Sequence, residues 1–369
     1  MKNYISIIDL GTGSIRNTVY AMEGEEMWSR RYENPLIQPK PGYAEQDPVA
    51  WWDILLRSFI EMPSDIKSRI VAISVTSQRE GIVPVDASFM PLGKIIIWLD
   101  GRSRSEAAYI GSVLGREQIY DICGLIPNPA WSLSKILWLR NNEPELFNNA
   151  YKFLQAEDYF ISRLAGKAVT EFSIASRTCL LDVYNKSWSD KILDTFSIPE
   201  HKLPELREPG SFVGYIREEI VAETGLPEGT MIYTGAGDQQ AAAVGAGAFG
   251  EGMASIGIGT SSAISMTIAS PVPDAKKKII LNCAALPGKW EYEPPIWNTG
   301  GLIKWFYENI TGQHQQYEQL IGDAGKIPPG SEGLIALPYF SGAGSPRWDP
   351  ELRGCFYGLS LAHNQSHML

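Results

Sequence analysis

Two short glycine-rich stretches carry the residue types that could hold a phosphate. The first reads DLGTGSIR at positions 9–16 and lies between strand-like runs at 4–8 and 18–22. Two strands joined by a Gly-Thr-Gly-Ser turn form a hairpin whose backbone N–H groups and hydroxyls can surround a phosphate. Asp9 closes the first strand, where its carboxylate could hold a hydrated Mg²⁺. A plain surface hairpin that tolerates glycine explains this stretch equally well.

The second stretch repeats the pattern of the first. Residues 255–269 read SIGIGTSSAISMTIA, which again predicts a strand, a turn beginning with Gly-Thr and a second strand. Thr260 matches Thr12 at an offset of 248 residues, since 260 − 12 = 248. An internal repeat of this kind predicts two similarly built halves, each with its own phosphate turn.

Asp238 lies between these two hairpins in the sequence and is the candidate general base. It follows the strand-like run MIYTGAG at 231–237 and precedes an alanine-rich helix that extends to about residue 247. Aspartate caps helices well, so a structural N-cap is one interpretation. The other is a base that takes the proton of a hydroxyl attacking a phosphoryl group. The position between two phosphate hairpins favours the base.

A further group of polar residues follows two predicted strands. The group comprises Gln78, Arg79 and Glu80 after the strand at 69–76, and Trp98, Asp100 and Arg102 around the end of the strand at 95–99. Arginine and glutamate at such positions could form an exposed ion pair of little energetic value. Together, an aromatic face and paired donors and acceptors could instead bind the hydroxyl groups of a polyol.

Two common nucleotide-binding motifs are excluded. GAGAFG at 245–250 has the glycine spacing of dinucleotide sites, but it follows a predicted helix and not a strand. No Gly-Lys pair in the chain is followed by Ser or Thr, so the lysine-containing phosphate loop is missing. An enzyme of this sequence that used ATP would hold the phosphates with hairpins and backbone amides.

Composition narrows the class of protein. The 369 residues are 44% hydrophobic and 20% charged, which fits a globular protein of two or three domains. The net charge, 32 − 42 = −10, disfavours nucleic acid and anionic membranes as partners. No apolar run reaches the ~18 residues that span a bilayer, and the first residues do not resemble a signal peptide. Four scattered cysteines fit reduced thiols, so we expect a cytoplasmic location.

The order of the predicted elements is that of an α/β protein. Strands at 4–8, 18–22 and 27–32 precede a helix that begins at Asp47-Pro48 and runs to about residue 62. A buried strand at 69–76 follows this helix. Further helices are predicted at 103–115, 132–141, 157–165, 302–310 and 315–324, and a late strand at 334–338. This alternation favours mixed sheets that are covered by helices.

In this order and spacing the motifs resemble the FGGY carbohydrate kinases, which belong to the actin/hexokinase-like superfamily. The resemblance covers nearly the whole chain. It is carried by DLGTGSIR at 9–16, YAEQDP at 43–48, SQREG at 77–81, WLDGR at 98–102, TEFSIASRT at 170–178, GAGDQQAAAVG at 235–245, GIGTSS at 257–262 and SGAGSPRWDPELRG at 341–354. It implies an actin/hexokinase-like (ribonuclease H-like) fold with mixed sheets, in which residues 1–247 bind sugar and residues 248–369 bind nucleotide.

The resemblance also implies roles for individual residues. Asp238 would be the catalytic base, and Asp9 would organise Mg²⁺ through water. The phosphates of ATP would contact Gly11, Thr12, Gly13, Ser14, Arg16, Gly259, Thr260 and Ser261. The sugar or polyol would contact Gln78, Arg79, Glu80, Trp98, Asp100, Arg102 and Gln239. ATP and Mg²⁺ are therefore the expected cofactors. The sequence leaves open whether the chain forms a homodimer.

The sequence departs from the family pattern in two places. The loop at 341–354 has Gly342-Ala343-Gly344 where the family usually carries a Glu-Arg pair after the first glycine. The family also continues for roughly a hundred residues beyond this point, as the size of a two-domain kinase suggests. We therefore expect an incomplete second domain, weak ATP binding and low turnover by this polypeptide alone.

The substrate is predicted only as a small polyol or ketose, such as glycerol or xylulose. Gln78-Arg79-Glu80 and Asp238-Gln239 resemble glycerol kinases, but Ala130 falls where those enzymes usually have Tyr. REGIV at 79–83 also resembles the autoinducer-signal kinases of the family. Two other functions stay open: a phosphatase or hydrolase on the same scaffold, and a sugar-binding remnant or pseudokinase without a complete ATP site.

Overall fold

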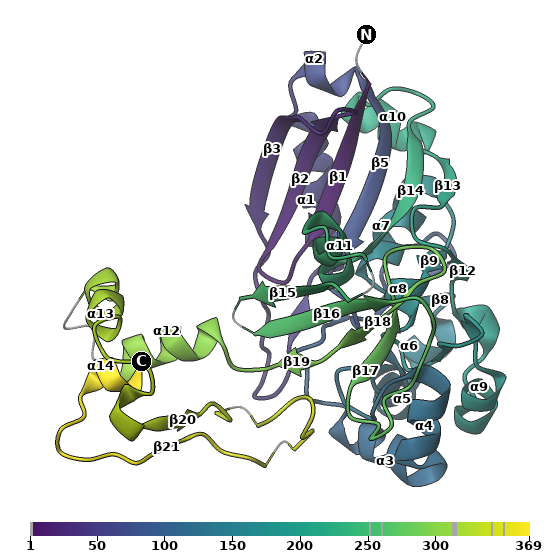
Figure 1. The fold of residues 1–369 in the computed structure, drawn as a ribbon. Helices are drawn as coiled ribbons and strands as arrows, with labels where there is room; N and C mark the ends of the chain where they lie inside the picture. The colour runs from purple at the N-terminus through teal and green to yellow at the C-terminus, as the bar shows by residue number, and fades with distance from the viewer. Residues whose placement is uncertain (1–2, 251, 260, 312–315, 341, 350) are drawn as a thin grey trace.

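A six-stranded mixed sheet forms the centre of the first half of the chain (Figure 1). The computed structural model describes residues 3–250, 252–259, 261–311, 316–340, 342–349 and 351–369. Strands β1, β5 and β14 run parallel, whereas their outer neighbours are antiparallel, so the predicted mixed sheet is confirmed. In spatial order the strands are β13 (Phe212–Tyr215), β14 (Met231–Gly237), β5 (Ile70–Ser77), β1 (Tyr4–Leu10), β2 (Ser14–Ala21) and β3 (Glu26–Glu33).

The sheet is held by a core that the hydrophobic pattern predicts. Helix α1 (Pro48–Ile60) begins where Asp47 accepts a hydrogen bond from the backbone N–H of Val49. Its apolar face, which includes Trp51 and Phe59, packs against the sheet. Helix α7 (Ala156–Ala165) packs against β5 and β14. Burial of these side chains supplies most of the driving force for this part of the fold.

A second core lies among short helices and strands that the chain forms mostly between β5 and β13. Its cluster of buried side chains joins residues of the helical region to Ile280, Leu281 and Cys283 of the second half. The helices of this region are α3 (Arg104–Leu114), α4 (Arg116–Cys123), α5 (Ser132–Asn142), α6 (Pro144–Asn149), α8 (Phe172–Ala175) and α9 (Asp190–Phe196). Helices α2 (Ser64–Lys67) and α10 (Glu218–Thr224) pack against the first core instead. The short strands are β4 (Glu45–Gln46), β6 (Val83–Val85), β7 (Ile95–Ile96), β8 (Lys152–Leu154), β9 (Val169–Glu171), β10 (Leu181–Asp182), β11 (Ser187–Trp188) and β12 (Glu205–Arg207). The strand predicted at 95–99 is therefore shorter than expected.

A second, antiparallel sheet begins after helix α11 (Asp238–Gly245). Its strands are β15 (Ala254–Ile258), β16 (Ser262–Ile268), β17 (Ile280–Cys283), β18 (Trp290–Glu293) and β19 (Pro295–Ile296). It is bonded to the helical region, since Leu281 N–H donates to the Gly124 carbonyl at 3.0 Å. Gly124 has φ +71°, and a Cβ there would overlap the Leu281 carbonyl oxygen, so only glycine allows this close contact.

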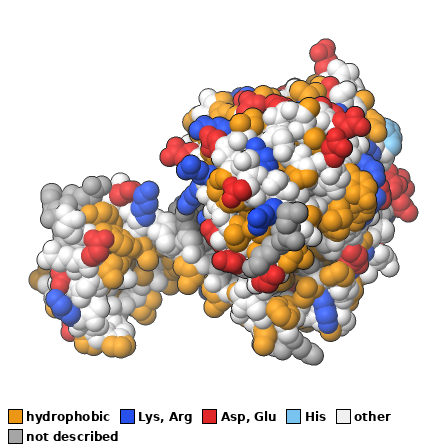
Figure 2. Space-filling view, turned by 90° about the horizontal axis from the view of Figure 1, so that it is seen from above, with side chains coloured by type: hydrophobic (Ala, Val, Ile, Leu, Met, Phe, Trp, Pro, Cys, Tyr) orange, Lys and Arg blue, Asp and Glu red, His pale blue; other side chains and the backbone are white. Residues whose placement is uncertain are grey.

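The elements from α12 to the end of the chain stand apart from the two sheets (Figure 1). It contains α12 (Gly300–Asn309), α13 (Tyr317–Ala324), β20 (Ile335–Leu337), β21 (Cys355–Tyr357) and α14 (Gln365–Met368). Hydrophobic side chains gather on it in Figure 2, and Ile321, Tyr357 and Leu361 are all exposed. The predicted helices at 302–310 and 315–324 and the strand at 334–338 are confirmed within a few residues. Among the described residues, no helix has the length and apolarity to cross a membrane.

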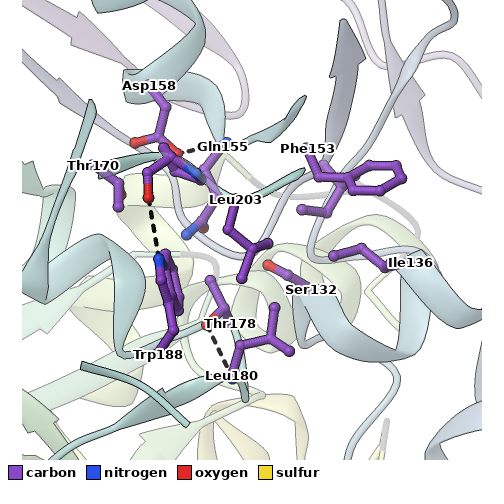
Figure 3. Close-up of a pocket in the computed structure, with 12 residues that line it drawn as sticks. Ser132, Ile136, Phe153, Gln155, Asp158, Thr170, Thr178, Leu180, Trp188 and Leu203 are labelled. Atoms are coloured by element: carbon purple, nitrogen blue, oxygen red, sulfur yellow. Dashed lines mark hydrogen bonds between the residues drawn. The ribbon is translucent and has the colours of Figure 1, made fainter. Parts of the chain in front are cut away.

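A small enclosed cavity lies beside the N-terminus of α7 (Figure 3). Its volume is about 10 Å³, which is room for one water molecule. Asp158 points toward it, and one carboxylate oxygen accepts a hydrogen bond from the backbone N–H of Gln155 at 2.9 Å. Burial raises the pKa of Asp158 from 3.8 to about 7. The folded protein therefore holds this proton more tightly than the unfolded chain does.

We expect Asp158→Asn to remove part of the pH dependence of stability. As the pH rises from about 4 to about 7, Asp158 ionises first in the unfolded chain, which lowers the free energy of unfolding by up to about 4 kcal/mol. Asparagine cannot ionise, so this loss should disappear. Urea unfolding at pH 5 and pH 8 measures it, with the exposed Asp65→Asn as control. An unchanged pH dependence in Asp158→Asn would contradict this account.

Candidate active site

The first hairpin turn presents two free backbone donors to solvent. Gly11 N–H donates to the Ser14 carbonyl at 2.9 Å, which closes the turn between β1 and β2. Asn34 fastens it from the side, because its Nδ2 donates to the Gly11 carbonyl at 3.1 Å. Within the described ranges, the N–H groups of Thr12 and Gly13 have no hydrogen-bond acceptor. Adjacent free N–H groups in a turn fit a phosphate oxygen.

Asp9 lies at the base of this turn, opposite Arg16 across the hairpin. Burial raises the pKa of Asp9, although the charges of Arg16 and Arg31 act against that rise. An open recess of about 450 Å³ adjoins the turn. It is lined by Gly13, Ser14, Arg31, Glu33, Asn34 and Pro35. A half-buried carboxylate of raised pKa is a group that a divalent cation would stabilise in its charged form.

A chain of hydrogen bonds connects the phosphate turn to the strand ends that follow β5 and β7. Trp98 Nε1 donates to Thr12 Oγ1 at 3.0 Å, and that hydroxyl donates to Gln78 Oε1 at 3.0 Å. Gln78 Nε2 then donates to Gln46 Oε1 at 2.7 Å, and Gln46 Nε2 donates to the Thr12 carbonyl at 2.7 Å, which closes the network. The structure thus brings the predicted phosphate residue Thr12 together with the predicted substrate residues Gln78 and Trp98.

Asp238 is the first residue of α11, and Gly237 occupies the N-cap position. The capping interpretation of Asp238 is therefore wrong by one residue. Its Oδ1 accepts from the backbone N–H of Gln239 at 2.7 Å and lies 3.4 Å from Arg79 Nε. Burial raises the pKa of Asp238 to about 6, even though Arg79 pulls it down. Its side chain is still 32% exposed, so a substrate hydroxyl can reach an ionised carboxylate at pH 7.

Arg79 connects the two sheets through a buried ion pair. Its Nη1 and Nη2 donate to the two carboxylate oxygens of Glu293 on β18 at 2.5 and 2.9 Å. Gln240 Oε1 accepts from Nη1 at 3.1 Å. Asn282 Nδ2 donates to Glu293 at 3.1 Å, and Arg177 lies 3.6 Å from it. Although burial opposes it, the two arginines lower the pKa of Glu293 to about 2.

Glu80 is held on every side by buried groups. Arg177 Nε donates to its carboxylate at 2.6 Å. Its backbone N–H donates to Gln155 Oε1 at 2.6 Å, and its carbonyl accepts from Ser132 Oγ and Lys135 Nζ, each at 3.2 Å. Glu80 has a positive φ of 69°, a strained conformation for this residue type, which these bonds fix in place.

Asp100 and Arg102 bond chiefly to each other and to the loop before β4. Arg102 Nε donates to Asp100 at 2.9 Å, and Arg102 Nη2 donates to Glu45 at 2.5 Å. The backbone N–H of Ala44 donates to Asp100 at 2.6 Å, while the guanidinium of Arg102 lies 3.9 Å from the centre of the Tyr43 ring. Both side chains are buried. They fix the loop that carries Gln46, and a substrate contact for them stays a prediction.

The second hairpin, β15–β16, is also antiparallel, but its connection between paired residues is one residue shorter than that of the first. Gly259 N–H donates to the Ser261 carbonyl at 3.0 Å, so the turn closes as predicted. The Gly259 carbonyl accepts from Gly300 N–H at 2.9 Å and from Thr299 Oγ1 at 3.0 Å. Thr260 lies outside the described residues. The hairpin is thereby joined to the N-terminus of α12.

Gln239 extends from α11 toward the second hairpin. A Cβ at Gly257 of β15 would lie 3.0 Å from its Oε1. Asp238 and Gln239, which are adjacent in sequence, therefore contact different parts of the molecule: Arg79 after β5 and the backbone of β15. Helix α11 packs against β5, β14 and both strands of the second hairpin, so it brings that hairpin close to the candidate base.

The model of the N-terminal domain of the FGGY family of carbohydrate kinases matches residues 4–245 of this chain. The model of the C-terminal domain of the same family matches residues 254–369. The chain belongs to the FGGY family of carbohydrate kinases. The match of both models along the chain identifies an enzyme that transfers a phosphoryl group to a sugar or polyol.

FGGY kinases of different substrates are similar to this chain in sequence and structure. The xylulose kinase of Lactococcus lactis subsp. lactis is 32% identical over 99% of this chain and 73% of its own length. The glycerol kinase of Thermococcus gammatolerans is 33% identical over the whole chain and 75% of its own length. The crystal structure of the gluconate kinase from Lactobacillus acidophilus superimposes with a TM-score of 0.94 at 29% identity, covering 100% of this chain and 75% of that one. The two-domain actin/hexokinase-like fold is therefore shown.

Three residues of this site are missing from the set of site residues that the sequence predicts. Gln46 and Arg177 lie inside the motifs YAEQDP and TEFSIASRT, which gave a signal without assigning these side chains. For Glu293 the sequence holds only a weaker indication of a buried charge, in the segment WEYE at 290–293. Alternation of glutamate with an aromatic residue places Glu291 and Glu293 on one face of a strand, and both are buried.

Proposed function

We propose that this FGGY kinase transfers the γ-phosphoryl group of ATP to a hydroxyl of a small neutral polyol or ketose, with Asp238 as general base. One observation carries the proposal. Asp238 is ionised near neutral pH and partly exposed, and α11 places it between Arg79, which follows β5, and the second hairpin. A base with a pKa near the working pH is efficient in this role.

The transfer needs little covalent chemistry from the protein. The substrate hydroxyl loses its proton to Asp238, its oxygen forms a bond to the γ-phosphorus, and the bond to the β,γ-bridging oxygen breaks to release ADP. Thr12 and Gly13 would donate backbone N–H groups to the phosphates, and the β15–β16 turn would hold them from the other side. Arg79 and Gln78 would position the acceptor beside the base.

Mg²⁺ fits the base of the first hairpin, where Asp9 would hold it through water. No group of three or more His, Cys, Asp or Glu side chains converges on a metal position in the part of the chain that the structure describes. Asp9 would therefore share the ion with phosphate oxygens and water. When bound, Mg²⁺ would neutralise charge on the phosphates.

Three further assignments are part of this proposal. The boundary between a sugar-binding unit, 1–247, and a nucleotide-binding unit, 248–369, falls in the interval between the two matched segments. A cytoplasmic location is supported by four free cysteines, three of them buried. A homodimer, and the absence of nucleic acid or membrane among its partners, stay predictions.

A coupled assay of ADP release tests the proposed function. With ATP, Mg²⁺ and glycerol, xylitol, xylulose or ribulose, we expect release that requires one of these acceptors. Release that is independent of any acceptor would instead indicate a hydrolase. Acceptor binding by calorimetry without nucleotide binding would indicate a sugar-binding remnant.

A further inference from the structure

Three of the five N–H donors of Arg79 are committed to acceptors within the protein. Its Nη1 and Nη2 are both committed to the carboxylate of Glu293 at 2.5 and 2.9 Å, and Gln240 accepts from Nη1 as well. Nε is buried and has no hydrogen-bond acceptor among the residues described, and it points toward Asp238 at 3.4 Å. The end of the guanidinium that carries Nη1 and Nη2 is therefore already paired with a carboxylate, so the positive charge of Arg79 is balanced by Glu293 before any ligand binds.

The charges around Arg79 are already balanced by carboxylates. Two guanidinium groups, those of Arg79 and Arg177, face three carboxylates, those of Glu80, Glu293 and Asp238. The sum is 2 − 3 = −1 when all are ionised. Glu291 adds nothing at pH 7, because burial and then the charge of Glu293 raise its pKa to about 8. The cluster therefore has no surplus positive charge.

The other cations near Glu80 and Gln46 are committed as well. Lys135 is fully buried, donates to the carbonyls of Glu80 and Ala130, and has its pKa lowered by burial to about 7. Arg102 is paired with Asp100 and Glu45. A substrate carboxylate placed beside Asp238 would meet like charge without a partner, which is unfavourable.

We propose that Glu293 is a specificity-determining residue: by pairing with Arg79 and balancing its positive charge, it makes the site accept uncharged polyols and ketoses and exclude sugar acids. This inference rests on the proposed function, because it concerns the acceptor bound beside Asp238. Glu293 acts through Arg79, so it is a positioning residue and not a catalytic one. It also comes from β18, so the second sheet sets the selectivity of a site whose residues Arg79, Glu80, Arg177 and Asp238 all precede that sheet in the chain.

Matched pairs of acceptors test this in the unaltered protein. Glycerol and glycerate, xylitol and xylonate, and glucitol and gluconate differ only in a terminal CH₂OH or carboxylate. We expect the neutral member of at least one pair to bind and to support ADP release at least about tenfold better than its acid. Equal use of both members, or preference for the acid, would overturn the inference while leaving the kinase function intact. If neither these compounds nor the ketoses xylulose and ribulose support ADP release, the proposed function itself is contradicted.

Glu293→Gln should change this preference in a defined way. It frees Arg79 and removes one negative charge, so the ratio of neutral to acidic acceptor should fall several-fold toward one. The charged groups that face Asp238 are Arg79, Glu80 and Glu293. Loss of Glu293 should therefore also move the acidic limb of the pH–rate profile to lower pH, which a merely structural role would not do.

Two further variants control for folding and for position. Glu291→Gln changes a neighbouring buried glutamate that is already neutral, so it should leave the acceptor ratio and the pH profile unchanged. Glu293→Asp keeps the charge and should keep the exclusion of sugar acids, which separates charge from packing if Glu293→Gln melts too low to assay. An unaltered acceptor ratio in folded Glu293→Gln, or loss of the preference in Glu293→Asp, would refute the role of Glu293.

Discussion

Asp238→Asn is expected to lower the turnover number by about 10²–10⁴-fold, the range for loss of a general base. The substitution keeps the size of the side chain and the oxygen that accepts from Gln239, but an amide cannot take the hydroxyl proton. Because Arg79 and Gln78 would still contact the acceptor under the proposed function, its dissociation constant should stay close to that of the unaltered protein. Initial rates of ADP release and calorimetric titration measure the two quantities separately.

Asp190→Asn provides a matched control for this prediction. Asp190 is the first residue of α9, as Asp238 is of α11, but it is exposed and far from the site in sequence. It should leave both the rate and the affinity unchanged. If Asp238→Asn keeps most of its rate, the assignment of the base is wrong; if it loses acceptor binding to the same extent as rate, Asp238 binds the acceptor and its catalytic role is unsupported.

Arg79→Met is expected to lower the free energy of unfolding by about 3–5 kcal/mol, as breaking a buried ion pair does. Methionine fills much of the same volume but leaves the Glu293 carboxylate without its two-pronged partner. Arg177 at 3.6 Å and Asn282 at 3.1 Å retain part of the compensation, which favours the lower end of the range. Acceptor binding should be lost together with this stability. Denaturant unfolding and calorimetry measure the two effects.

The same substitution at a surface ion pair shows what burial contributes. Arg57 pairs with Glu61 at 2.6 Å on α1, and its side chain is 65% exposed. Arg57→Met should cost little, since solvent screens exposed pairs. Equal losses in Arg57→Met and Arg79→Met would mean that the pair between the two sheets is no more than a surface contact, and the role of Glu293 would lose its basis.

Local patterns in the sequence determined most of the elements and the candidate chemistry. The alternating apolar residues of β1 and β5, the Asp47-Pro48 start of α1 and both Gly-Thr turns depend on neighbours a few residues away. Such features follow from backbone preferences and from one-sided burial, which act over short stretches of chain. The same holds for Asp238: its position after a strand and a glycine-rich turn indicated a candidate general base without any information on tertiary contacts.

Only the tertiary structure decided which partners the charged side chains take. Arg79 and Glu293 are 214 residues apart, and nothing near either residue predicts their pairing. Asp100 and Arg102, for which the sequence predicts a substrate contact that stays a prediction, bond to each other and to the loop before β4, and no local pattern indicated these partners. The reason is physical: a buried charge must be neutralised by whatever the packing places beside it, and that depends on how the two sheets dock. The sequence thus identified a kinase site, and the packing of β18 against Arg79 decided the charge that this site presents.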